Sequence, residues 1–250
     1  MEHKNAHIPI DHLRIYVEDC LNISDYIISV GCGNGQYEYS ISENNLNLKN
    51  KLILVDPNPE SFRKYPADSK YLKTNYKSVS DLIKDKPNVI NNCVLLLIWP
   101  YSNDQLILNP KEDVNYDIES VKNLNPNSII CLYDTPQTMP NGSSGSDGLI
   151  CFIRGSCDQS STANDMSKNY RHISTTRYAF KDDLGNSYPK ISWLAKKGSQ
   201  VPKIKKCLKL QKEADKLCGE LLKTEETYKF GINEMVNTQK YVMNMLKSLK

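Results

Sequence analysis

The stretch Tyr26-Ile27-Ile28-Ser29-Val30-Gly31-Cys32-Gly33-Asn34-Gly35 is an apolar run that ends in three glycines within five positions. Its β-branched residues predict a first strand that is covered on both faces, and its glycines predict a tight turn after that strand. Glycine tolerates positive φ and has no Cβ, so a ligand can come close to the backbone at such a turn. The stretch therefore predicts a strand and a turn suited to ligand binding.

A second apolar run, Lys51-Leu52-Ile53-Leu54-Val55-Asp56, ends in a carboxylate. It follows the glycines by about twenty residues, where a βαβ nucleotide-binding fold has the acid that holds ribose hydroxyls. Pro57-Asn58-Pro59 breaks the chain next, so Asp56 is expected at the C-terminal end of its strand, where open parallel sheets bind ligands. Turn and acid together predict a nucleoside site. The alternative is an ordinary strand-to-helix turn without a ligand.

The segment Ser29–Gly35 resembles the first motif of the class I S-adenosylmethionine-dependent methyltransferases, which is an acid, an apolar residue and Gly-x-Gly-x-Gly. In the dinucleotide fingerprint Gly-x-Gly-x-x-Gly the third glycine would fall at Gln36, so the methyltransferase spacing fits better. Glu38, expected in the first turn of the next helix, disfavours a pyrophosphate there but is harmless to a cationic sulfonium. At one position the chain departs from the family. The acid that helps to hold the methionine amino group is Ser29 here, which can only hydrogen-bond.

The resemblance, over residues 10–197, implies a Rossmann-like three-layer α/β sandwich with S-adenosyl-L-methionine as cofactor. Its mostly parallel sheet is expected to have seven strands and to end in an antiparallel hairpin, with strands at 172–180 and 191–196. The implied cofactor contacts come from the turn and from later strand ends: Ser29, Gly31, Cys32, Gly33, Gly35, Asp56, Pro57, Asn75, Trp99 and Pro100. Asn75 follows a short expected third strand at 71–74 and is equally explained as a turn residue.

Two further strands are predicted from apolar runs at 93–98 and 128–134, with a helix at 116–124 between them. After the first run, amino-methylating members of the family have Asn or Asp, then Pro-Pro and an aromatic residue. This chain keeps only Pro100 and Tyr101, so methylation of a nucleic-acid base amine is not inferred. Tyr101 and Asp134 are the candidate catalytic residues. Tyr101 is expected to act as an acid or a base or to stabilise a cation, and Asp134 is expected to contact the substrate with its carboxylate. Packing at a strand end and a turn cap are their structural alternatives.

With 250 residues, of which 39% are hydrophobic and 24% charged, the chain is long enough for one main domain and a smaller extension. The boundary is expected near Gly198, which gives a domain at 1–198 and a helical extension at 199–250. No apolar run approaches the roughly 20 residues of a membrane span, and no apolar signal core follows Met1, so a cytoplasmic protein is expected. The cysteine and histidine spacings match no zinc pattern, so no metal is expected.

The extension is basic and has a helical periodicity. Residues 201–250 contain eleven lysines and six acidic residues, and apolar residues recur at intervals of three and four over 207–249. This pattern predicts one long coiled-coil helix that pairs with another chain, or two helices that bend near Gly231 and fold back. A homodimer or a protein partner is expected through residues 203–250. The charge is compatible with nucleic acid, although a solvated helix face is the favoured explanation.

The hypothesis from the sequence is an S-adenosylmethionine-dependent methyltransferase with an unidentified acceptor, because acceptor residues vary freely on such a fold. One alternative is a catalytically inactive methyltransferase-like binding or scaffold protein, suggested by Ser29 and the incomplete loop at Trp99-Pro100. A less favoured alternative is a nicotinamide-dependent oxidoreductase, which would bind a dinucleotide and have a parallel sixth strand.

Overall fold

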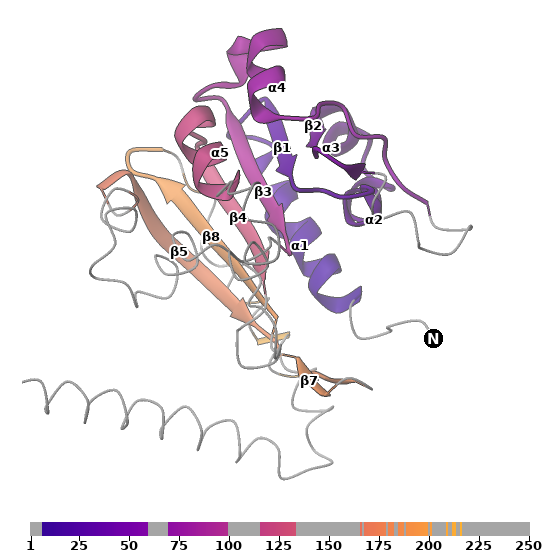
Figure 1. The fold of residues 1–250 in the computed structure, drawn as a ribbon. Helices are drawn as coiled ribbons and strands as arrows, with labels where there is room; N and C mark the ends of the chain where they lie inside the picture. Colours follow the sequence, from indigo (N-terminus) through magenta and orange to yellow (C-terminus); the bar gives the residue numbers. More distant parts are fainter. Residues whose placement is uncertain are drawn as a thin grey trace, which may run out of the picture.

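The computed structural model describes residues 7–59, 70–99, 116–133, 166, 168–178, 180–182, 185–187, 189–199, 201, 209, 212–213 and 216. Within them a twisted sheet is flanked by helices (Figure 1). Its strands are β1 (Tyr26–Val30), β2 (Leu52–Val55), β3 (Cys93–Ile98), β4 (Ser128–Tyr133), β5 (Tyr170–Arg177) and β8 (Lys190–Lys196). The short strands β6 (Phe180–Asp182) and β7 (Gly185–Ser187) pair with each other in a separate two-stranded sheet.

The main sheet has the strand order β2-β1-β3-β4-β8-β5. Strands β2, β1, β3 and β4 are parallel, whereas β8 is antiparallel to both β4 and β5. The C-terminal ends of β1, β2, β3 and β4 therefore lie side by side, and β5 ends on the same side of the sheet. Open α/β sheets bind ligands at the C-terminal ends of their strands, so the topology brings the glycine turn and the residues after β2, β3 and β4 together there.

The central strands are almost entirely apolar because helices cover both of their faces. All six residues of β3 and of β4 are buried, and so are all four of β2. Alternate residues point to opposite faces: Leu96 and Ile130 belong to one cluster, and Leu95 and Ile129 to the other. This two-sided burial explains why the strands have no polar alternation in the sequence.

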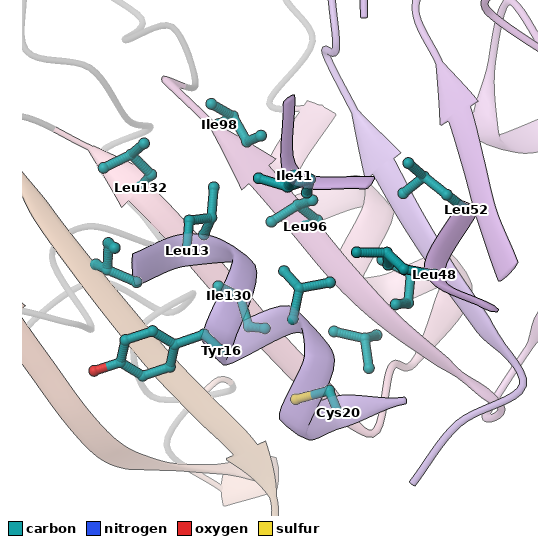
Figure 2. Packing of buried hydrophobic residues seen from close by; sticks show 14 of the residues in the cluster. Leu13, Tyr16, Cys20, Ile41, Leu48, Leu52, Leu96, Ile98, Ile130 and Leu132 are labelled. Atoms are coloured by element: carbon teal, nitrogen blue, oxygen red, sulfur yellow. The ribbon is translucent and has the colours of Figure 1, made fainter. Parts of the chain in front are cut away.

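Helices α1 (His7–Cys20), α2 (Gln36–Ser42) and α3 (Leu46–Lys51) cover the first face. Figure 2 shows Leu13 of α1 over the side chains of β3 and β4, with Ile41 of α2 and Leu48 of α3 on the same face of the sheet. The ring of Tyr16 points instead toward β8, where it meets the ring of Trp193 edge-on. Helices α4 (Val79–Asp85) and α5 (Tyr116–Leu124) and the 3₁₀ helix η3 (Pro87–Val89) contribute to the cluster on the second face. Helices on both faces of the sheet make the three layers of a Rossmann-like α/β fold.

The structure corrects the expected edge of the sheet. The predicted strand at 71–74 is not formed, and the pairing there is reduced to a single parallel bridge between Val55 and Tyr76. In the described residues the main sheet therefore has six strands rather than seven. The expected single strand at 172–180 is also divided, because β5 ends at Arg177 and residues 180–187 supply β6 and β7.

The predicted boundary near Gly198 and the extension at 199–250 remain predictions. Beyond Ser199 the described residues are Val201, Lys209, Lys212, Glu213 and Lys216, and the last four are helical. Glu213 lies beside α1, with its Oε2 3.9 Å from His12 Nε2. No helix in the described ranges is long and apolar enough to cross a membrane.

Candidate functional site

The glycine turn connects β1 with both β2 and α2. Gly31, Gly33 and Gly35 have φ angles of 72°, 55° and 73°, a left-handed conformation that other residues adopt only with strain. The Gly31 N–H donates to the Val55 carbonyl over 2.9 Å, and the Gly35 N–H donates to the Cys32 carbonyl over 3.0 Å. The turn is thus held by backbone hydrogen bonds, and its sequence follows from the φ angles that it requires.

Two of the three glycines also leave room for atoms of the chain itself. A Cβ on Gly31 would lie 2.9 Å from the ring of Tyr116, the first residue of α5. A Cβ on Gly35 would lie 2.5 Å from the Leu72 carbonyl oxygen and 2.8 Å from Leu54 Cδ2. Close packing within the fold is therefore sufficient to explain the absence of side chains at Gly31 and Gly35.

Asp56 lies directly beside the turn, as the spacing of the two apolar runs predicts. Its Oδ2 accepts a hydrogen bond from the Gly33 N–H over 2.8 Å, and its Oδ1 accepts one from the Asn58 N–H over 2.8 Å. Burial raises the pKa of the Asp56 carboxyl group, although both amide donors act in the opposite direction. A carboxylate oxygen has about two acceptor positions, so Asp56 retains the capacity to accept further hydroxyl groups.

Below the turn, Ser29 and Glu38 form a buried pair that the sequence analysis missed. Ser29 Oγ donates to Glu38 Oε1 over 2.6 Å, and both residues are fully buried. Glu38 Oε2 is also buried, and it has no hydrogen-bond partner within the described ranges. Burial raises the pKa of Glu38 to about 7; the Asp56 charge adds to this rise and the Ser29 hydroxyl opposes it.

Cys32, predicted as a cofactor contact, has an inert thiol. Burial raises its pKa far above the usual range for a thiol, and the charges of Glu38 and Asp56 raise it further. Its Sγ is 3.9 Å from Thr74 Oγ1. Because a thiol acts as a nucleophile only when it is deprotonated, Cys32 contributes packing to the turn rather than covalent chemistry.

Asn75 has a structural role at the free edge of β2. Its side-chain oxygen Oδ1 accepts a hydrogen bond from the Leu54 N–H over 2.8 Å, and its backbone N–H donates to the Leu54 carbonyl over 2.9 Å. These bonds satisfy the outer side of β2, beyond which the described part of the chain has no further strand. Pro57, after Asp56, is exposed. The adenine contact expected for Asn75 remains a prediction.

Trp99, at the end of β3, has a strained backbone. Its φ is 51°, although it is a bulky residue, and its N–H donates to the Leu132 carbonyl over 2.8 Å. The half-buried side chain packs against the cluster that lies under α1. Strain of this kind costs about 1–3 kcal/mol and is concentrated at ligand sites. Pro100, Tyr101 and Asp134 lie outside the described residues, so their predicted roles remain predictions.

The electrostatic character of the site is acidic. Glu38 and Asp56 interact with each other and with Cys32, and neither carboxylate has an ion-pair partner in the part of the chain that the structure describes. The described ranges also contain no group of three or more His, Cys, Asp or Glu residues able to hold a metal ion. A site with two uncompensated carboxyl groups favours a cationic ligand over a phosphate.

No family model matches the sequence, and no curated protein matches it significantly. Among solved structures, the small RNA methyltransferase HEN1 is 12% identical with a TM-score of 0.39, and the alignment covers 79% of this chain and 25% of HEN1. The N-methyltransferase NodS from Bradyrhizobium japonicum WM9 is 8% identical with a TM-score of 0.34, covering 76% of this chain and 97% of NodS. The antibiotic-resistance methyltransferase Kmr is 16% identical with a TM-score of 0.31, covering 72% of this chain and 92% of Kmr.

These alignments are loose, and this chain spans about a quarter of the length of HEN1. No assignment of activity or substrate is drawn from them. The described structure itself has parallel strands β2, β1, β3 and β4, a left-handed glycine turn after β1 and an acid after β2. In these features the chain resembles the class I S-adenosylmethionine-dependent methyltransferases.

Proposed function

We propose that this chain is an S-adenosylmethionine-dependent methyltransferase. The observation that carries the proposal is the hydrogen bond between the Gly33 N–H and the Asp56 carboxylate, over 2.8 Å. This bond joins the glycine turn to the acid after β2, which are the two parts of a nucleoside site on an open α/β sheet. The methyl acceptor is unidentified.

The residues present fit this cofactor in both charge and hydrogen-bonding capacity. Asp56 would hold the ribose hydroxyls with its remaining acceptor positions. Glu38 Oε2, a buried acceptor without a described partner, favours a ligand that carries positive charge. A pyrophosphate at the start of α2 would be repelled by the Glu38 carboxylate, which argues against a nicotinamide dinucleotide at this turn.

When bound, S-adenosylmethionine supplies a methyl group that its sulfonium already activates. The protein then has to hold the cofactor, align the acceptor and exclude water. Asp56 and the glycine turn serve the first of these tasks. Trp99 and Pro100 are proposed to border the cofactor, and Tyr101 and Asp134 to contact the acceptor, with Tyr101 able to act as an acid or base.

A second candidate is a binding or scaffold protein that has the fold without turnover. It is favoured by the packing of the chain's own atoms beside two of the glycines, where a ligand could otherwise come close. The ring of Tyr116 lies against Gly31, and the Leu72 carbonyl lies against Gly35. Both oxygens of Asp56 also already accept from backbone amides. The two candidates differ in whether the cofactor binds at all.

Calorimetry with S-adenosylmethionine and a nicotinamide dinucleotide tests the proposal, followed by transfer of a labelled methyl group to pools of protein, RNA, DNA and small molecules. We expect S-adenosylmethionine alone to bind. Asp56→Ala should weaken its binding by about tenfold to a hundredfold, since hydrogen bonds to charged groups contribute about 1.5–3 kcal/mol each.

The matched control is Asp25→Ala. Asp25 is exposed and directly precedes β1, at the end of the strand away from the glycine turn, so its removal should leave the affinity for the cofactor unchanged. Absence of S-adenosylmethionine binding would contradict the proposal and favour the scaffold candidate. Binding of the dinucleotide instead would favour an oxidoreductase.

A further inference from the structure

Glu38 is a costly residue in its position, because a fully buried carboxyl group is stabilised there by one hydroxyl group and by the backbone of Glu38 itself, without a cation among the described residues. Ser29 Oγ satisfies Oε1, whereas Oε2 is buried without a partner among the described residues. Burying a charge is unfavourable unless it is paired, and a buried acceptor that lacks a hydrogen bond has its own penalty. Packing alone would be served better by an apolar side chain, so the position calls for another explanation.

The groups around Glu38 do not compensate its charge. From β1 it meets Ser29, from the turn it interacts with Cys32, and from the end of β2 it interacts with Asp56, which is itself acidic. Arg14 of the adjacent α1 donates to the Ser40 carbonyl and pairs with Asp11. Lys70 lies over the ring of Tyr39, 5.9 Å from its centroid. Within the described residues, neither of these cations forms an ion pair with Glu38.

Glu38 also reaches the place that an acid occupies in the methyltransferase motif. The first residue of the motif is Ser29 in this chain, and Ser29 Oγ is the atom that Glu38 Oε1 accepts from. The carboxylate is thus brought from α2 to the end of β1 through a hydroxyl group. A charge at that place, in surroundings of low polarity, acts strongly on any charge that binds over the turn.

We infer that Glu38 is a specificity residue that makes the turn prefer a cationic cofactor over its neutral product, and that it loses its proton when the cation binds. This inference rests on the proposed function. S-adenosylmethionine and S-adenosylhomocysteine share the nucleoside and the amino-acid group, and they differ by the methyl group and the positive charge on sulfur. An ionised Glu38 attracts the ammonium group that both ligands carry, and it additionally stabilises the sulfonium of S-adenosylmethionine, so the product leaves more readily than the substrate.

The coupling follows from linkage. The pKa of Glu38 is raised to about 7 in the protein alone, so near neutral pH a fraction of the molecules has a proton on this carboxyl group. A bound cation lowers that pKa by favouring the ionised form, and the proton is released to solvent. Preference for the cationic cofactor should therefore be weak at pH 6 and strong at pH 8.

Calorimetry with S-adenosylmethionine and S-adenosylhomocysteine at pH 6, 7 and 8, in two buffers of different ionisation enthalpy, measures affinity and proton release together. For the wild-type chain we expect the affinity ratio of the two ligands to grow about tenfold from pH 6 to pH 8, with partial proton release on binding the cation at pH 7. Glu38→Gln should make the ratio independent of pH and abolish the release.

Two further variants separate this effect from a change in folding. Ser29→Ala retains the carboxylate but removes the hydroxyl that lowers its pKa, so the preference should develop at higher pH. Glu43→Gln makes the same substitution at an exposed residue directly after α2 and should behave as wild type. All variants are first compared by thermal unfolding.

The outcomes distinguish the two proposals. If the wild-type chain binds neither ligand, the proposed function is wrong. If it binds both and Glu38→Gln changes neither the ratio nor the proton release, the proposed function stands and the role of Glu38 is wrong. An equal loss of affinity for both ligands would also contradict the role in specificity, and it would assign Glu38 to the ammonium group that both ligands carry or, if thermal unfolding changes as well, to the structure of the turn.

Discussion

Asp56 and Glu38 are neighbouring buried carboxyl groups, but the chain stabilises them differently. Asp56 accepts from two backbone amides, whereas Glu38 accepts from one hydroxyl and has a second oxygen without a described partner. Burial raises both pKa values, and that of Glu38 reaches about 7. Hydrogen-bond donors of both kinds stabilise the ionised form, but among the described residues only Asp56 has a donor on each oxygen, so Glu38 is the carboxyl group whose charge responds to pH near 7.

Glu38→Gln should stabilise the fold more at pH 8 than at pH 4. The pKa of Glu38 is raised from 4.5 to about 7, so the folded chain holds this proton more tightly than the unfolded chain, and stability is lost as the pH rises through that window. Glutamine does not ionise. The gain in unfolding free energy should therefore increase by about 3 kcal/mol between the two pH values, as measured by urea unfolding.

The exposed substitution Glu43→Gln is the control and should give no such trend. A gain for Glu38→Gln that is the same at both pH values would show that ionisation of Glu38 has no part in stability. Other groups titrate in this range, including His12, whose pKa is lowered by burial. Comparing each variant with wild type at the same pH cancels their contributions.

Gly35→Ala tests whether the turn needs glycine for its conformation, for space, or for both. The φ of 73° strains any other residue by about 1–2 kcal/mol. The new Cβ would in addition lie 2.5 Å from the Leu72 carbonyl oxygen, so backbone atoms would have to shift. We expect an unfolding free energy lower than that of wild type by at least about 3 kcal/mol.

Gly198→Ala is the matched control, because its φ is 84° and no atom lies within 4 Å of the added Cβ. It should cost only the conformational strain of about 1–2 kcal/mol. Equal destabilisation by the two substitutions, in urea unfolding, would mean that the turn has room for a side chain after all.

At the scale of elements, β2 is an outermost strand of the main sheet, so the backbone groups on its outer side have to find hydrogen-bond partners outside the sheet. The segment 70–76 does not form a strand, but it supplies hydrogen-bond acceptors to β2 and to the residue after it. The Asn75 side-chain oxygen accepts from the Leu54 N–H, and the Tyr76 carbonyl accepts from the Asp56 N–H. Unpaired edges promote wrong pairing, so this segment protects β2 as well as stabilising it.

Asn75→Ala should destabilise the chain by about 1–3 kcal/mol, because the buried Leu54 N–H would lose its acceptor. Asn75→Asp retains an acceptor oxygen at the same position and should be close to wild type. The same variants test the adenine contact predicted for Asn75. If Asn75→Ala weakens cofactor binding without lowering the unfolding free energy, Asn75 serves the ligand rather than the strand.

The sequence predicts those elements whose signal is local. Four buried strands, at 26–30, 52–55, 93–98 and 128–133, follow from runs that are apolar except for Ser29 and Ser128, and the helix Tyr116–Leu124 lies between two of them as predicted. The segment 71–74 has a strand-like composition, but whether it pairs depends on the side chains that reach β2, and Asn75 takes that place. Strand existence at an edge is therefore decided by tertiary contacts.

The candidate site follows the same division. Gly33 and Asp56 could be linked from the sequence, because the βαβ spacing fixes both ends of the contact. The pairing of Ser29 with Glu38 could not be, since it depends on the path of the turn between them. A serine in the place of an acid, with a glutamate nine positions later at the start of a helix, was the available signal. No feature of the sequence predicts the contact between the Tyr116 ring and Gly31, because this contact depends on how α5 packs against the sheet.

At the scale of the whole molecule, the described hydrophobic clusters belong to the body and to the first residues of the extension. Every described member of the two clusters lies at or before Val201. Beyond Val201, a described contact with the body is that of Glu213 Oε2 with His12 Nε2, over 3.9 Å, and a partly exposed pair of this length contributes little. We predict that residues 1–201 fold without residues 202–250.

Ending the chain after Val201 should convert a self-associating protein into a monomer that retains cooperative thermal unfolding. The expected reason is the repeat of apolar residues over 207–249, which buries its apolar side only against a second helix. Light scattering after size-exclusion chromatography, at several concentrations, compares the mass of the full and shortened chains. Monomers in both cases would favour a helical pair that folds back near Gly231, and an oligomer in both would place the contact between chains on the α/β body.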